Sequence, residues 1–210
     1  LLLIPMMLFL LVLGFFRGKY WCGNYCPHAS LFDHLLLPFA PLKKIPKFVK
    51  TRLARGLFFG FYMFMFMRRI MAIVSLWGTL DFWDKLGFIF AVNYLMPTLL
   101  GSALALLVNP RAWCSFCPMG TMQILAYRLG QVTNLNFKTD ERITITDLDQ
   151  CRACGKCARV CPMQLEPYKH FDPYNQFADE ACIKCGVCAA NCPFGLLTLQ
   201  KVSEGRKQTA

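Results

Sequence analysis

Nearly all of the long apolar stretches lie in the first 130 residues of the chain. Three of them predict membrane-spanning helices, at residues 1–16, 57–80 and 86–108. The second and third reach the roughly 20 residues that a helix needs to cross a bilayer, whereas the first is shorter. Because the chain has no initiator Met and begins inside the first stretch, we expect upstream residues to complete that span. The pattern therefore predicts an α-helical membrane domain over residues 1–130, with three visible spans.

The charged residues indicate how these spans are oriented. The loop between the first two spans is strongly basic and contains one acid, Asp33. Its basic residues are Arg17, Lys19, Lys43, Lys44, Lys47, Lys50, Arg52 and Arg55. Since basic loops stay on the cytoplasmic side, we expect this loop and everything from residue 109 onward to face the cytoplasm of a prokaryotic cell. We interpret the net charge of +11 as the excess of basic residues that orients a protein in the cytoplasmic membrane. The expected partner of these basic residues is therefore the lipid bilayer and not nucleic acid.

The end of the basic loop has two interpretations. Residues 47–55 place Phe48, Val49 and Leu53 among four basic residues. This pattern fits a short amphipathic helix on the membrane surface, and it fits a solvated basic loop equally well.

Residues 131–210 have the composition of a soluble module. A polar linker, residues 131–142, precedes Ile143–Thr146, where alternating apolar and polar side chains predict a strand. Leu197–Gln200 alternate in the same way and predict a second strand. We expect a small α+β domain over residues 131–202, followed by a flexible polar tail at residues 203–210.

All twelve cysteines fall into four short motifs. Two motifs have identical spacing, Cys151-x2-Cys154-x2-Cys157-x3-Cys161-Pro162 and Cys182-x2-Cys185-x2-Cys188-x3-Cys192-Pro193. This run is the signature of bacterial ferredoxins with two [4Fe–4S] clusters. Thiols in such a run persist in a reducing compartment, which again indicates the cytoplasmic side.

The spacing also predicts which cysteines share a cluster, because the fourth cysteine of each run ligates the other cluster. One predicted ligand set is Cys151, Cys154, Cys157 and Cys192. The other is Cys182, Cys185, Cys188 and Cys161. Gly155 and Gly186 are expected to let the backbone turn tightly beside the clusters. A pair of zinc sites is the alternative, although zinc sites rarely use this run in duplicate.

The remaining motifs, Cys22-x3-Cys26-Pro27 and Cys114-x2-Cys117-Pro118, each follow an apolar stretch. A basic residue and a Trp precede each of them, so that the two segments form an internal repeat. Four thiols, two from each copy, would hold a third iron–sulfur cluster where the membrane meets the cytoplasm. The alternatives are a redox-active thiol pair or structural thiols.

Arg68 and Arg69 lie near the middle of the second predicted span. A charge inside the membrane is costly and marks a candidate functional site, for which a quinone headgroup or a lipid phosphate is a suitable partner. The alternative is that the helix shifts and that the arginines pair with Asp81, Asp84 or a partner subunit.

Membrane spans, two Cys-Pro motifs and a two-cluster ferredoxin domain together resemble the NapH/NosR-type membrane ferredoxins, which include the MauN and YccM groups. The resemblance covers almost the whole chain, and the segments WCGNYCP and WCSFCP carry it. The second segment has two residues between its cysteines where the family usually has three, and relatives often have four or more spans. The resemblance implies an iron–sulfur electron-transfer subunit of a membrane redox complex, which passes electrons between a quinone pool or a membrane partner and redox partners on the cytoplasmic side.

Two other functions remain open. CcoG-type proteins resemble this plan and are linked to copper reduction during oxidase assembly, so the paired motifs would then reduce or transfer a metal ion. The protein would otherwise be a membrane anchor that docks a catalytic subunit. The sequence contains no nucleotide-binding glycine loop and no hydrolytic triad, and no catalytic residue is predicted.

Overall fold

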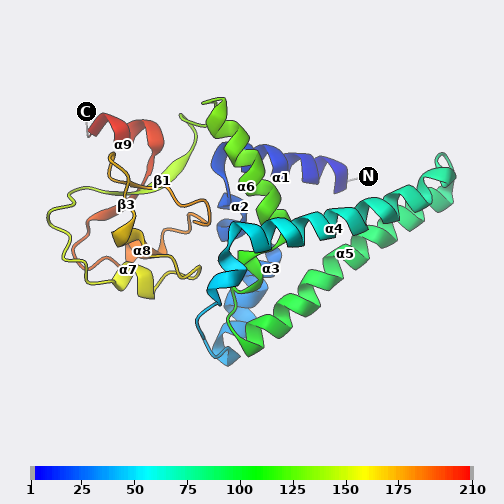
Figure 1. The fold of residues 1–210 in the computed structure, drawn as a ribbon, viewed down its shortest axis with the longest axis horizontal. Helices are drawn as coiled ribbons and strands as arrows, with labels where there is room; N and C mark the ends of the chain where they lie inside the picture. Colours follow the sequence, from blue (N-terminus) through cyan, green and yellow to red (C-terminus); the bar gives the residue numbers. More distant parts are fainter. Residues whose placement is uncertain (1–2, 209–210) are drawn as a thin grey trace. The chain divides into compact units, whose positions relative to one another are not determined.

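The computed structural model describes residues 3–208, whose fold is shown in Figure 1. The chain divides into two compact units, one comprising Leu1–Cys26 with Met122–Ala210 and the other Pro27–Thr121. The predicted domain boundary at residue 130 therefore does not coincide with a boundary between units. The reason is that α1 (Leu3–Arg17) and the later part of α6 (Pro118–Val132) pack together, with Gly14 against Gln123. Residues 1–2 of the first predicted span lie outside the described residues.

The unit Pro27–Thr121 is helical and contains the two longest helices, α4 and α5. Its elements are α3 (Pro27–Ser30), a π-helical segment (Leu31–Leu36), 3₁₀ turns (Leu37–Phe39, Lys47–Lys50, Val74–Leu76 and Trp113–Ser115), α4 (Arg52–Ile73) and α5 (Leu80–Leu107). Among the described residues, two helical stretches are long and apolar enough to cross a membrane, Arg52–Leu76 and Leu80–Leu107.

The two long helices begin earlier than the sequence predicts, at residue 52 instead of 57 and at residue 80 instead of 86. Each start is fixed by a threonine cap, a residue type favoured at that position. Thr51 Oγ1 accepts a hydrogen bond from the Ala54 N–H at 3.2 Å, and Thr79 Oγ1 accepts one from the Phe82 N–H at 3.3 Å. The Thr51 cap also divides the basic segment 47–55 into a 3₁₀ turn and the first turn of α4, so this segment is neither a single surface helix nor an irregular loop.

The first apolar stretch does not continue as a straight span. Helix α1 ends at Arg17, and the next residue, Gly18, has a left-handed φ of 61°. Beyond it the chain continues as Tyr20–Phe39, at an angle of 103° to Pro5–Arg17. The two segments qualify as a span only as a pair, either as one broken span or as a re-entrant loop.

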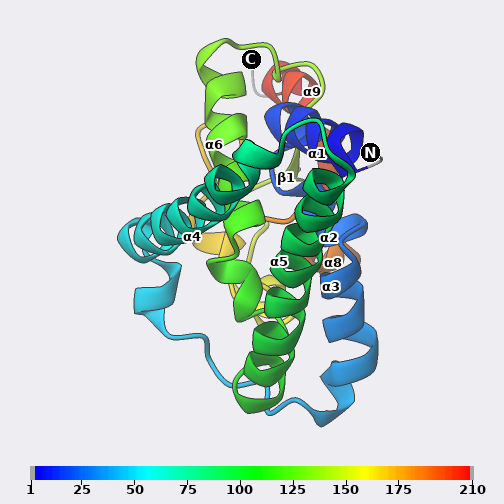
Figure 2. The same cartoon turned by 90° about the vertical axis from the view of Figure 1, so that its right-hand side faces the viewer.

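Helices α4 and α5 form a V that closes at the turn between Leu76 and Leu80 (Figures 1 and 2). Near this turn Ile73, Phe82 and Ile89 are buried against one another. Farther along α5, the Phe32 ring packs on Gly101 next to Trp113. Most other side chains of the two helices are apolar and exposed, as expected for helices that lipid surrounds.

The C-terminal part of the other unit contains a three-stranded antiparallel sheet with the order β2-β1-β3. Its strands are β1 (Glu141–Ile145), β2 (Gln176–Phe177) and β3 (Leu197–Lys201). Both predicted strands are confirmed and pair with each other, whereas β2 is too short to show an alternating pattern. Ile143 is the partner of Phe177 on one side and of Leu199 on the other, and it lies in the core of the domain.

Residues 202–208 form helix α9 (Val202–Gln208) where the sequence predicts a flexible tail. Contacts with the sheet explain the helix. Val202 is buried and its N–H donates to the Asp140 carbonyl at 2.9 Å. Gly205 lies so close to the Gln176 side-chain amide that a Cβ would overlap it. Residues 209–210 lie outside the described residues.

The close contact between Phe32 and Gly101 leaves no room for a side chain at position 101. A Cβ at position 101 would lie 2.5 Å from Phe32 Cζ, so Gly101→Ala should lower the stability of the protein by about 1–3 kcal/mol. Gly87→Ala in the same helix is the matched control, because no atom lies within 4 Å of its added Cβ. Thermal unfolding in detergent, followed by tryptophan fluorescence, measures the difference. Equal melting temperatures for the two variants would contradict this account of the packing.

Candidate metal centres

Four of the predicted ligands surround one cavity, here called the first cavity. Its thiols are those of Cys151, Cys154, Cys157 and Cys192. Three precede or begin α7 (Lys156–Arg159), and the fourth follows α8 (Val187–Ala190). The rest of the lining is mainly apolar and includes Ile145, Phe171 and Leu197. The structure thus brings together the whole first predicted ligand set, including the cysteine from the other motif.

A second cavity contains the other predicted set. Its thiols are those of Cys161, Cys182, Cys185 and Cys188. Apolar side chains again complete the lining, among them Ile143, Met163 and Ile183. The Cys161 Sγ also accepts a hydrogen bond from the Leu165 N–H at 3.4 Å, a contact typical of the backbone around cluster sulfurs.

The backbone around the two cavities is duplicated. The residue before the second cysteine of each motif is left-handed, with φ of 47° at Ala153 and 54° at Lys184. The residue after it is the predicted glycine, with φ of 69° at Gly155 and 72° at Gly186. Left-handed residues alternating with ordinary ones turn successive N–H groups toward one point, which creates the anion-binding concavities found at many iron–sulfur sites.

These cavities fit an iron–sulfur cluster better than single zinc ions. Zinc sites rarely use duplicated x2-x2-x3 cysteine runs. Four thiols around a shared, mainly apolar cavity, with one thiol of each set from the opposite motif, suit a cluster that carries several irons.

Burial keeps several of these thiols neutral. It raises the pKa of Cys182 to about 11, and burial together with neighbouring thiols raises the pKa of Cys188 to about 12. Burial also raises the pKa of Cys157 in the first cavity. Because only thiolates ligate iron, loading either cavity must release protons.

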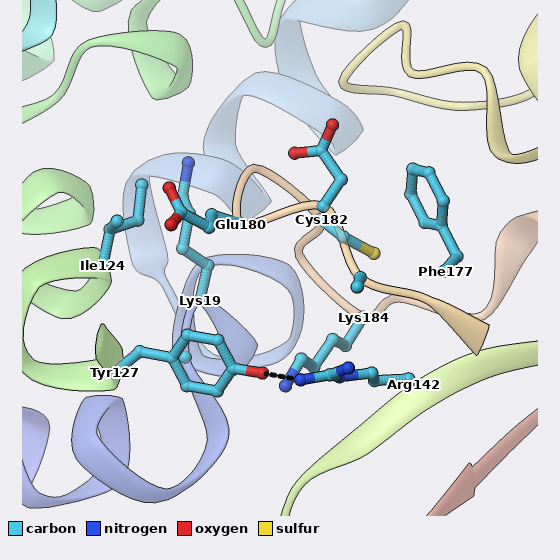
Figure 3. A pocket seen from close by; sticks show the side chains of 11 residues that line it. Lys19, Ile124, Tyr127, Arg142, Phe177, Glu180, Cys182 and Lys184 are labelled. Carbon is cyan, nitrogen blue, oxygen red and sulfur yellow. Dashed lines mark hydrogen bonds between the residues drawn. The ribbon is translucent and has the colours of Figure 1, made fainter. Parts of the chain in front are cut away.

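A buried charge network that the sequence did not reveal lies next to Cys182 of the second cavity, and Figure 3 shows three of its members, Tyr127, Arg142 and Lys184. Its centre is Asp140, which is 1 % exposed and forms an ion pair with Lys184, the residue directly before Cys185. The Tyr127 hydroxyl donates to Asp140 Oδ2 at 2.5 Å, and Arg142 Nη2 donates to the Tyr127 oxygen at 3.1 Å. Burial lowers the pKa of Lys184, although the nearby Asp140 carboxylate opposes this effect.

No local pattern marks these residues as partners. Asp140 lies at the end of the polar linker, and Lys184 occupies a position inside a cysteine motif where the spacing requires no particular residue. Long-range packing brings them together, and a bidentate ion pair between Arg128 of α6 and Glu180, at 2.7 and 2.6 Å, holds the loop 179–185 nearby.

The first of the two remaining Cys-Pro motifs, Cys22-x3-Cys26-Pro27, lies in and after α2 (Tyr20–Asn24). The Cys22 thiol is buried and donates a hydrogen bond to Gln123 Oε1 at 3.4 Å. The Cys26 N–H donates to the Trp21 carbonyl at 3.0 Å, and Pro27 then begins α3.

The second of these motifs, Cys114-x2-Cys117-Pro118, repeats this turn in the other unit. The Cys117 N–H donates to the Trp113 carbonyl at 3.0 Å, and Pro118 begins α6. The turn is one residue shorter, because a 3₁₀ turn (Trp113–Ser115) replaces the α-helical turn of the first copy. Both copies therefore form the same hydrogen bond to the Trp carbonyl although their cysteines are separated by three residues in one and two in the other.

Arg111 precedes Cys114 by the same distance as Lys19 precedes Cys22. It is buried and forms a bidentate ion pair with Asp33, with Nε to Oδ1 at 3.0 Å. Burial opposes its charge, yet the neighbouring Cys114 and Asp33 raise its pKa.

Arg68 and Arg69 lie in the last two turns of α4, nearer the end of the helix than the predicted span implied. Arg69 Nη1 donates to Asn93 Oδ1 of α5 at 3.4 Å. In the part of the chain that the structure describes, neither arginine forms an ion pair with Asp81 or Asp84.

Comparisons with known proteins identify the same two regions. Residues 150–197 match the model of a 4Fe-4S dicluster domain, and residues 1–46 with 93–134 match the model of a 4Fe-4S binding domain. An uncharacterized protein of Methanocaldococcus jannaschii is 25 % identical over 166 residues, which cover 77 % of this chain and 58 % of that protein. The chain therefore spans little more than half the length of this relative. No solved structure matches the chain.

Iron–sulfur electron transfer is the class of function that these findings define. The chain carries two ferredoxin-type 4Fe–4S domains, and one of them covers both Cys-Pro motifs outside the ferredoxin runs. Within residues 3–208, two helices are apolar and long enough to cross a membrane, or up to three if the bent pair is one span, which is compatible with a membrane protein.

The Asp140–Lys184 pair is expected to stabilise the fold, because Lys184→Met removes one of two cations that face the buried Asp140 carboxylate and leaves Arg142, at 3.3 Å, as its ionic partner. Lys184→Met should lower the free energy of unfolding by about 1–3 kcal/mol, and the double variant Asp140→Asn, Lys184→Met should lose less. Lys169→Met, which breaks the exposed pair of Lys169 with Glu166, should leave stability unchanged. Denaturant unfolding of the iron-loaded protein, followed by its visible absorption, measures all three. A double variant as unstable as Lys184→Met would contradict the explanation.

Cluster assembly should accelerate as the pH rises, since the neutral thiols of Cys182 and Cys188 must lose protons to bind iron. Below the ordinary thiol pKa of 9.0, these thiols are neutral in both the folded and the unfolded iron-free protein. Above it the unfolded protein loses protons first, so the free energy of unfolding falls until the folded thiols also ionise, at about 11 and about 12.

Anaerobic reconstitution at about pH 6 and about pH 9, followed by visible absorption, tests this expectation. Loaded protein transferred between the two conditions is the control for cluster survival. Equal rates of incorporation would show that deprotonation does not limit assembly.

Proposed function

We propose that the protein is the electron-transfer subunit of a membrane redox complex of the NapH/NosR type, and that it passes electrons between a quinone or another subunit in the membrane and cytoplasmic redox partners. The observation that carries the proposal is the gathering of eight cysteines around two cavities, each with one thiol from the opposite motif. When bound, iron–sulfur clusters would accept and release single electrons there. The protein would supply thiolates, inward-facing amides and an apolar shell, which together set the reduction potentials.

A third cluster at Cys22, Cys26, Cys114 and Cys117 is part of this proposal. One 4Fe-4S family model matches both segments that contain these cysteines, although 46 residues separate its two matched parts. Each cysteine pair has the same Trp-carbonyl turn followed by a proline that starts a helix. Equivalent geometry in both copies supports one shared role for the four thiols over two unrelated structural roles.

The polar pair between α4 and α5 is the proposed contact for a quinone headgroup. Arg69 contacts the Asn93 side-chain oxygen, while Asn93 Nδ2 is buried and has no hydrogen-bond partner within residues 3–208. An unpaired amide donor and a guanidinium among apolar side chains suit a ligand with carbonyl oxygens. In this proposal the ferredoxin domain faces the cytoplasm of a prokaryotic inner membrane, which the basic loop at residues 43–55 supports.

Quinone oxidation of the reduced protein tests the proposal. The iron-loaded protein should contain about twelve irons per chain, and a quinone should reoxidise its reduced clusters, since two electrons and two protons convert quinone to quinol. Cys114→Ala should reduce the content to about eight irons and abolish reoxidation, while the ferredoxin signals persist. Iron analysis and electron paramagnetic resonance (EPR) spectroscopy provide the two measurements.

Ser115→Ala is the matched control, because Ser115 is a buried neighbour of Cys114 outside the predicted ligand set. About eight irons in the unaltered protein would exclude the third cluster. Full reoxidation by quinone in Cys114→Ala would exclude this centre from the electron path.

A further inference from the structure

The segment that contains Cys22 and Cys26 lies directly against the ligand loop of the second cavity. Gly23 faces Ile183 so closely that a Cβ at position 23 would overlap the Ile183 carbonyl oxygen. Ile183 is buried, follows Cys182 in the chain and lines the second cavity. The backbones of the two cysteine segments are therefore in van der Waals contact, and the glycine leaves no side chain between them.

A second set of contacts holds the same two segments together. Gly18 and Lys19, which precede α2, line a small pocket whose opposite wall contains Cys182 and Lys184 (Figure 3). Tyr127 joins the two walls, because its ring contacts the space where a Cβ of Gly18 would lie and also faces the Lys184 ammonium at 4.9 Å. The close approach of Gly23 to Ile183 is thus part of an extended buried contact.

The first cavity has different surroundings. All of its lining residues fall between Ile145 and Leu197, so the N-terminal segment contributes nothing to it. Cys154 is exposed, and so are Arg152 and Phe194, whose guanidinium and ring stack at 5.3 Å. The first cavity therefore has solvent-exposed lining residues, whereas Ile183 of the second cavity is covered by the Gly23 segment.

We infer that electrons cross between the Cys22–Cys26 segment and the ferredoxin domain through the second cavity, and that the first cavity is the solvent-facing end of the path. This order rests on the proposed electron-transfer function and holds for either direction of flow. One electron moves in each step, so the site that donates is oxidised by one unit and the site that accepts is reduced by one unit.

Electron injection from a fixed point tests the order. A ruthenium photosensitiser is attached to the iron-loaded variant Asn24→Cys, because Asn24 is exposed and adjoins Gly23. Ascorbate gives one electron to the photoexcited label, which passes that electron into the protein. EPR spectra of rapidly frozen samples then show which cavity holds the reduced cluster.

The labelled protein is compared with and without each cluster. Cys154→Ala removes a ligand of the first cavity and should leave the rate of reduction in the second unchanged. Cys185→Ala removes a ligand of the second cavity and should slow reduction in the first by an order of magnitude or more. The opposite pattern, or equal slowing in both variants, would overturn the inferred order, and iron analysis confirms that each variant keeps its other cluster.

A steric variant repeats the test with all twelve natural cysteines present. Gly23→Ala pushes Ile183 away and should slow injection into the second cavity, whereas Gly60→Ala, where no atom lies within 4 Å of the added Cβ, should not. An unchanged rate in Gly23→Ala would also overturn the inference. Failure of quinone to reoxidise the protein, with the flash results as expected, would instead reject the proposed membrane function and leave the internal order intact.

Discussion

The exchange of one cysteine between the two ferredoxin motifs is the constraint on which the domain depends. Cys192 must reach the first cavity and Cys161 the second, so the chain between them has to reverse direction and close on itself. The antiparallel pairing of β1 with β3 satisfies this requirement, because it joins the residues before the first motif to those after the second. The core residues Ile143, Ile145 and Leu197 then form an apolar layer against the cavities.

The Asp140 network adds a second level of organisation. A buried ion pair is weak evidence for stability in itself, but it defines one arrangement of the groups that it joins. Asp140 contacts Lys184 of the ligand loop, Tyr127 of α6 and Arg142 of β1, so three elements distant in sequence meet at one carboxylate. In the same unit Gly14, Gly18 and Gly23 each allow a close approach to Gln123, Tyr127 or Ile183. Backbone contacts and fixed charges together determine where the N-terminal segment lies on the ferredoxin domain.

Much of the site could be predicted from the sequence, because cluster ligation is encoded locally by cysteine spacing. The spacing gave the two ligand sets that the structure gathers around its cavities, and alternating residues gave β1 and β3. Long-range packing left no comparable signal. The two-residue strand β2, helix α9 and the partners of Asp140 all depend on contacts between residues far apart in the chain. The helix starts at Thr51 and Thr79 were missed for another reason, since the caps lie outside the apolar stretches that defined the predicted spans.

The duplicated backbone has a consequence for the energetics of the two sites. Ala153 and Lys184 occupy equivalent left-handed positions, as do Gln164 and Gly195, whose N–H groups close matching turns onto Cys161 and Cys192. Identical geometry would give two sites of equal potential and no preferred residence for an electron. The surroundings differ, since Cys154 is exposed whereas the Lys184–Asp140 ion pair is buried beside Cys182. Equivalent ligand loops in unlike surroundings would give their clusters different reduction potentials, so that an electron would favour one of the two sites.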